Sequence, residues 1–124
     1  MNSALFRKTV TKALRELPEA FLEKLENVEV IVEEFADAET LDSLGIDSPW
    51  DLLGLYVGVP LDQQSVFLTG YLPERIYVYR RPILRAARTR KNVEKLIREV
   101  VLHEIGHHFG FDDDQLEAMM ERGS

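Results

Sequence analysis

The stretch HEIGHHFG, residues 103–110, constrains the fold more than any other part of the sequence. It follows a segment in which apolar residues recur at helical spacing from Val93 to Val101. This periodicity predicts one long helix from about Thr89 to Phe109, ended by Gly110. Two histidines and a glutamate would then lie on the last turns of that helix.

The position of these side chains around the helix axis follows from about 100° per residue. His103, Glu104 and His107 fall at about 280°, 20° and 320° from Val93, which overlaps the apolar stripe. Leu102 falls at about 180°, on the far side. The spacing therefore predicts polar groups on the buried face of the helix, where unpaired polar atoms are costly.

A metal ion would satisfy these polar groups. Residues four apart lie one above the other on a helix, so the imidazoles of His103 and His107 can share one ion. Glu104 can hold a water on that ion and act as general base. The chain has no cysteine, so any ligands must be His, Asp or Glu. The competing interpretation is two core histidines with satisfied hydrogen bonds.

A third ligand is expected just beyond Gly110, which can adopt the positive φ that turns the chain back. Asp113 matches the HExxHxxGxxH spacing of the metzincins, with aspartate in place of the last histidine. Asp112 and Asp114 are its neighbours, so the ligand is uncertain by one residue. Zinc, one ion per chain, is the favoured metal, because His and Asp are acceptable zinc ligands.

Three nearby residues invite comparison with such sites. His108 falls at about 60°, away from the motif histidines, which favours a packing or supporting role. Met119 and Met120 resemble the methionine turn of metzincins, but they also fit the core face of a short helix, where methionine is ordinary filler.

The remaining chain predicts a single domain over residues 1–124. We expect helices at Ser3–Leu17, 18–28 and 115–123, strands at Val28–Phe35 and Arg75–Arg81, and a loop at 36–49. Core candidates between them are Trp50, Leu52, Leu53, Leu55 and Tyr56. Gly54 and Gly58 are assigned to turns or close packing. In the second strand, Ile76 and Val78 would face one side and Tyr77 and Tyr79 the other, with Pro82 ending the ladder or marking an edge.

Composition excludes several classes of function. The net charge of −7 argues against general nucleic-acid binding. No run of 18 apolar residues exists, so no membrane span is expected, and the absence of cysteine fits the cytoplasm. Six cations lie within residues 80–91, without a carboxylate. They could attract an acidic substrate or a nucleic-acid partner, or form a solvated face around a helix start.

The sequence resembles the small bacterial zincin-like metallopeptidases, sometimes described as minimal zincins. HEIGHHFGFDDDQL carries the resemblance, supported by RIYVYRRPI and GLYVGVPL. It implies a compact α+β fold with the active-site helix on a small mixed sheet, flanked by N-terminal and C-terminal helices. It also implies His103, His107 and Asp113 as metal ligands and Glu104 as the catalytic glutamate.

The expected function is therefore zinc-dependent hydrolysis of peptide bonds, with metal-activated water and Glu104 as general base. We expect narrow specificity. If RIYVYRR is an edge strand, it could pair with an extended peptide, and Tyr77 or Tyr79 could stabilise the oxyanion or simply be packed. The alternatives are a hydrolase of small amides and a metal-binding or protein-interaction module with a weak or vestigial site. The natural substrate and the oligomeric state are not predicted.

Overall fold

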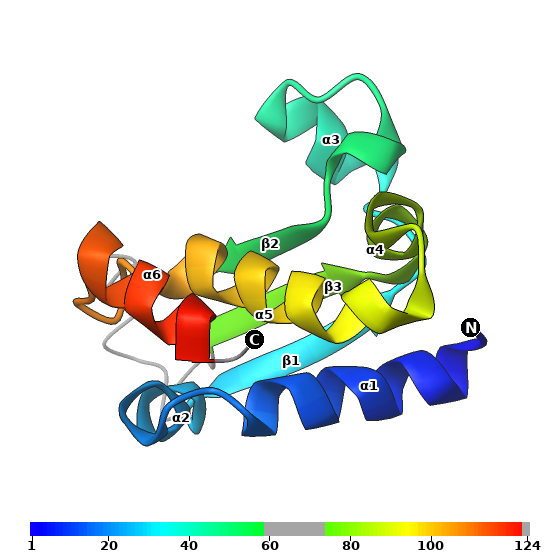
Figure 1. Ribbon diagram of the computed structural model, residues 1–124. Coiled ribbons are helices and arrows are strands. Elements are labelled where there is room, and N and C mark those ends of the chain that lie inside the picture. Colours follow the sequence, from blue (N-terminus) through cyan, green and yellow to red (C-terminus); the bar gives the residue numbers. More distant parts are fainter. Residues whose placement is uncertain (59–73, 123–124) are drawn as a thin grey trace.

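The computed structural model describes residues 1–58 and 74–122, which form an α+β fold as expected (Figure 1). In chain order the elements are α1 (Ser3–Arg15), α2 (Glu19–Leu25), β1 (Val28–Glu33), α3 (Ala38–Leu44), the 3-10 helix η1 (Pro49–Asp51), β2 (Gly54–Val57), β3 (Glu74–Tyr79), α4 (Arg80–Ala87), α5 (Arg90–Ile105) and α6 (Asp113–Arg122). None of the helices in this described part is long and apolar enough to cross a membrane. The end of the GLYVGVPL motif, residues 59–61, lies outside the described residues.

The sheet of the described chain is mixed and has the order β1-β3-β2. The central strand β3 runs parallel to β1 and antiparallel to β2, with Val32 opposite Val78 and Tyr56 opposite Ile76. The expectation that RIYVYRR could be an edge strand is therefore wrong, because β3 is paired on both sides. Pro82 marks no edge either; it is buried in the first turn of α4.

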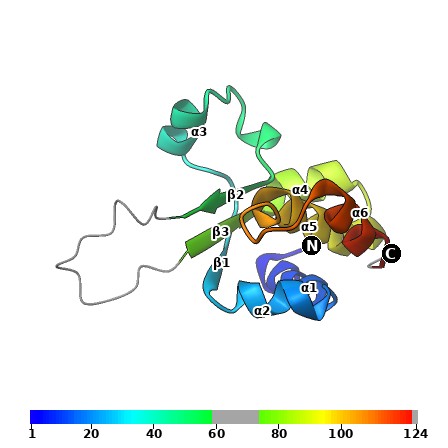
Figure 2. The same ribbon diagram turned by 90° about the vertical axis from the view of Figure 1, so that its left-hand side faces the viewer.

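The two faces of the sheet are covered differently. Ile76 and Val78 are fully buried under the helices, in two clusters that contain residues of α1, α2, α4, α5 and α6. Tyr77 and Tyr79 lie on the opposite face, as the alternation of β3 predicted, and pack near Leu41 of α3. In both views α3 lies apart from the other helices (Figures 1 and 2).

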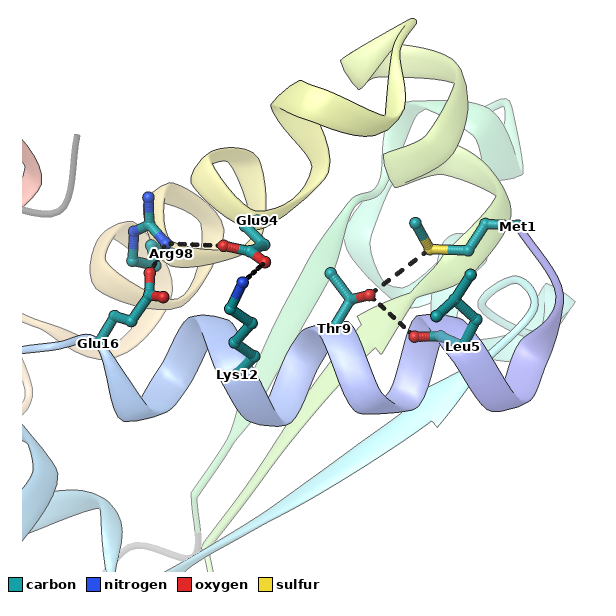
Figure 3. Close-up of polar contacts among 7 residues, drawn as sticks. All are labelled: Met1, Leu5, Thr9, Lys12, Glu16, Glu94 and Arg98. Carbon is teal, nitrogen blue, oxygen red and sulfur yellow. Dashed lines mark hydrogen bonds and ion pairs between the residues drawn. The ribbon is translucent and has the colours of Figure 1, made fainter.

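The junction between α1 and α5 is closed by charged side chains (Figure 3). Arg98 is the one charged residue in the described chain that is buried, at 6% exposure. Its guanidinium lies 2.7 Å from the carboxylate of Glu16 and 3.8 Å from that of Glu94, which also binds Lys12 at 3.1 Å. This network fixes the helix that carries the HEIGHHFG motif against α1.

Two helices form where none was expected. The predicted loop at 36–49 contains α3, because the Asp37 side chain caps its first turn and Gly45 ends it with φ of +70°. Helix α4 begins directly after β3 and buries Ile83 and Ala87. Trp50 was expected in the core but is 37% exposed, because it lies against Phe35 and the guanidinium of Arg85 at the surface.

Candidate metal and catalytic site

The motif side chains lie on the open margin of α5 and of the turns that follow it, not on the buried face. Leu102 and Ile105 are fully buried, whereas His103, Glu104 and His107 are exposed. The helical-wheel expectation was wrong because α5 is covered from two directions. The sheet covers one flank and residues of α2 and α6 cover the next, so the buried arc extends beyond the apolar stripe. The three polar side chains are therefore accessible to a ligand.

The chain turns back after His107 as predicted from Gly110. Regular α-helix ends at Ile105, and hydrogen-bonded turns continue to Gly110, which has φ of +91°. The N–H of Phe111 donates to the carbonyl of Gly106 at 3.2 Å, and the N–H of Gly110 donates to that of His107 at 3.0 Å. These two bonds form the Schellman motif that commonly ends a helix with glycine.

Packing under this turn holds it in place. The rings of Phe109 and Phe111 lie 5.0 and 5.8 Å from that of Phe21, which is fully buried in α2. A side chain at Gly106 would collide with Leu116 of α6. The residues of this segment that are not candidate ligands therefore pack α5, α2 and α6 together. The spacing of the ligands gave no sign of this role.

The aspartates that follow the turn have distinct positions. The carboxylate of Asp112 accepts from the N–H of Gln115, and the Gln115 side chain accepts from the N–H of Asp112, both at 2.8 Å. This reciprocal pair is a capping box, so α6 begins at Asp113, two residues before the expected helix. Asp113 Oδ1 lies 3.1 Å from His107 Nε2. The cap occupies Asp112 and leaves the Asp113 carboxylate facing His107.

These side chains can be compared with what zinc requires. Within residues 1–58 and 74–122, no three His, Asp or Glu side chains stand close enough together to hold one ion. The structure brings His107 and Asp113 together and leaves His103 apart. Ligand atoms on a tetrahedral zinc lie about 3.4 Å apart, given bonds of about 2.1 Å. The separation of 3.1 Å is close to that value, and imidazole and carboxylate are zinc donors, so the pair His107 and Asp113 fits two of the ligand positions on a zinc ion.

Glu104 is held against the edge of the sheet. Its carboxylate accepts a hydrogen bond from the backbone N–H of Tyr56 in β2. A side chain at Gly54 would lie 2.6 Å from Val100 and 4.0 Å from Cγ of Glu104, so glycine allows β2 to approach α5. Partial burial raises the pKa of Glu104, while the Tyr56 N–H and the nearby His103 oppose the rise. The close packing expected for Gly54 is confirmed, and it fixes the position of Glu104.

Tyr77 and Tyr79 lie on the other face of the sheet from α5. Their rings stack at 6.3 Å, and Tyr79 is 2% exposed beside Ala36 and Leu41. Burial raises the pKa of Tyr79 to about 12. Of the two roles considered for these tyrosines, packing is the one that the structure supports.

His108 contacts a tyrosine of strand β2. Its ring lies 4.5 Å from that of Tyr56, consistent with a packing or supporting role. Met119 and Met120 are partly buried against the cluster around Leu116, as expected for core filler. Tyr56 was considered only as a core residue, and the sequence held no signal that its backbone would bind Glu104.

Two surface pockets differ in the residues that line them. A pocket of about 300 Å³ borders His103 and Glu104, between α5 and the segment that enters β2. A larger groove of about 580 Å³ runs between α1, α2 and β1 and is lined mainly by apolar side chains such as Leu14 and Val30. None of its lining residues belongs to the motif, so the smaller pocket is the one associated with the candidate site.

The cations of residues 80–91 are partly engaged within the protein. Arg80 binds the carboxylate of Glu34 at 2.6 Å, and Arg81 approaches the same group at 3.6 Å. Arg85 lies over the ring of Trp50 at 5.0 Å. These contacts fit the interpretation of a solvated basic face on α4 better than a cluster directed at Glu104.

A helix bearing HExxH, a glycine turn and a returning carboxylate together define the zincin class of metal site. A family model described as zincin-like metallopeptidase matches residues 25–122, and the chain belongs to that family. The matched region includes the whole sheet, α5 and α6. Membership implies zinc binding in general and a peptide or protein substrate. None of the curated proteins compared with the chain matches it.

Proposed function

We propose that this protein is a zinc-dependent peptidase that binds one zinc per chain through His103, His107 and Asp113. The observation that carries the proposal is the 3.1 Å approach of Asp113 to His107, across the turn at Gly110. It supports Asp113 over Asp112 as third ligand, because Asp112 is engaged in capping α6. His103 lies on the last turn of α5, four residues before His107, and its side chain would have to move toward that pair to complete the set.

Zinc, when bound, would supply a Lewis acid that polarises the amide carbonyl and makes a water molecule more acidic. The chain's own contribution is Glu104, whose carboxylate would take a proton from the attacking water and pass it to the leaving amine. The Tyr56 N–H orients this carboxylate. Partial burial, which raises the pKa of Glu104, brings it closer to the range suited to a general base at neutral pH.

Within the described residues, β2 forms the edge of the sheet beside Glu104, and we expect this strand, not RIYVYRR, to align a peptide. The N–H of Tyr79 donates to the carbonyl of Leu53, so residues 54 and 56 direct their backbone groups away from β3. The N–H of Tyr56 already binds Glu104, so a peptide would pair through the backbone groups of Gly54. Because the strand is short and the pocket has a volume of only about 300 Å³, little surface is available to bind a long substrate. This supports narrow specificity. The acidic substrate suggested by residues 80–91 stays a prediction.

The test combines metal analysis with digestion of a peptide library. Purified protein should contain one equivalent of zinc, and zinc-loaded enzyme should cleave a limited set of peptides. A chelator should abolish cleavage and added zinc should restore it. The matched control is Asp114→Ala, a neighbouring carboxylate expected to leave zinc binding unchanged.

The rival functions give different results in the same experiment. A hydrolase of small amides would bind one zinc and leave every peptide uncut while releasing amine from small amide substrates. A binding module with a vestigial site would hold less than one equivalent of zinc and hydrolyse neither kind of substrate. Either result would contradict the peptidase proposal.

A further inference from the structure

The pocket beside Glu104 has the size and position of a site for one substrate side chain. Its volume of about 300 Å³ is at the lower end of ligand pockets, which suits a single side chain. His103 and Glu104 are part of its lining, and so is Gly54 of β2. A peptide bond held at Glu104 would therefore direct a neighbouring side chain into this pocket.

Four of the nine residues that line the pocket have apolar side chains. Leu52 and Leu53 precede β2, and Leu96 and Val100 come from α5. The three leucines are half-buried, so their apolar surface remains available for contact. An aliphatic stem of three or four carbons could lie along these residues.

Carboxylates accompany this apolar lining. Asp51 and Glu99 both border the pocket, in addition to Glu104. No lysine or arginine of the described chain lines it. Asp51 also borders a neighbouring pocket that holds Arg85 and Arg88, so its charge is shared between the two, whereas Glu99 is not among the residues that line that neighbouring pocket.

This charge pattern discriminates between substrates. An acidic side chain would meet like charges, and such contacts are an effective means of rejecting a wrong partner. A lysine or arginine side chain could place its stem on the leucines and its cation near Asp51 and Glu99. An apolar side chain would contact the leucines but would gain nothing from the two carboxylates.

We propose that this pocket, lined by Leu52, Leu53, Leu96 and Val100 and bordered by Asp51 and Glu99, selects a lysine or arginine side chain next to the cleaved bond. The inference rests on the proposed peptidase function and names its substrate class. It is the opposite of the acidic preference suggested by residues 80–91, so one experiment separates the two.

The experiment digests a proteome-derived peptide library with zinc-loaded wild type and with the double variant Asp51→Asn/Glu99→Gln. The matched control is Asp42→Asn/Glu117→Gln, which removes two exposed carboxylates on α3 and α6. Wild type and control should favour Lys or Arg over Asp or Glu at one flanking position by about tenfold. In the Asp51/Glu99 variant, kcat/KM for a lysine peptide should fall about tenfold, and that for its leucine counterpart should change less than twofold.

A binding measurement provides an independent readout. Zinc-loaded Glu104→Gln protein should bind a lysine peptide more tightly than the matched glutamate peptide in calorimetric titration. Cleavage without a basic preference, or the same preference in the Asp51/Glu99 variant, would overturn this inference and leave the peptidase function standing. A library that wild type leaves uncut would overturn the peptidase function, and this inference with it.

Discussion

The imidazole Nε2 of His107 lies 3.1 Å from the carboxylate Oδ1 of Asp113, although five residues and a change of direction separate them in the chain. Three local features produce this contact. Gly110 reverses the chain with a positive φ, Phe109 and Phe111 fix the turn on Phe21, and the capping box starts α6 at Asp113. Both side chains remain exposed, at 60% and 91%, so a metal ion could reach the two atoms.

Removal of Asp113 should therefore weaken zinc binding. Asp113→Ala is expected to lower zinc affinity by a factor on the order of 100, since loss of even a supporting residue costs about 10–100-fold. Isothermal titration with zinc measures the change, and Asp114→Ala is the control. Equal loss in both variants would mean that the aspartate run acts by general charge and not through one ligand.

Asp112 should matter for stability. Its carboxylate caps α6 by accepting a hydrogen bond from the N–H of Gln115. Its removal should lower the free energy of unfolding by about 1 kcal/mol. Urea denaturation of the metal-free protein tests this, and Asp112→Asn, which keeps a capping oxygen, should restore most of the loss. An unchanged midpoint for the alanine variant would show that the cap contributes nothing.

Two glycines with positive φ provide a matched pair. Gly45 and Gly110 have φ of +70° and +91°, and a Cβ at either would meet no atom within 4 Å. Alanine at either position should cost about 1 kcal/mol through backbone strain alone. Only Gly110→Ala should also weaken zinc binding, because only this turn brings Asp113 to His107. Equal zinc affinities in the two variants would show that the turn at Gly110 is not needed for zinc binding.

The network at Arg98 should contribute to stability without touching the metal site. Arg98→Ala leaves the carboxylate of Glu16 without its 2.7 Å partner and should cost about 2 kcal/mol. Lys95→Ala removes an exposed cation from the same helix and should cost less than about 0.5 kcal/mol. Thermal unfolding compares them. A similar loss in both would indicate an effect of net charge.

Sequence patterns predicted the parts of the molecule that depend on local chemistry. Gly110 ended the run of hydrogen-bonded turns that follows α5, because glycine adopts its φ at little cost. The alternation in β3 correctly separated Ile76 from Tyr77. The place of β3 at the centre of the sheet was not predictable, because a short apolar strand reads alike at an edge and in the middle.

The candidate site was predicted in its residue types but not in its surroundings. A helical wheel assumes one buried direction, so it placed Leu102 outside and His103 inside, the reverse of what packing by α2 and α6 produces. The contact of Glu104 with Tyr56 joins residues 48 positions apart, and no local pattern reports such a pairing. Helix α3 was missed although its capping residues, Asp37 and Gly45, were visible in the sequence.

The central claim is that Glu104 moves the proton in peptide hydrolysis, and the most direct test is kcat/KM of zinc-loaded Glu104→Gln on a peptide that wild type cleaves. The amide is nearly isosteric but cannot accept a proton, so kcat/KM should fall on the order of 1000-fold. Zinc affinity and unfolding midpoint should stay close to those of wild type, because Glu104 is not a proposed ligand. Wild-type kcat/KM in the fully zinc-loaded variant would contradict the claim.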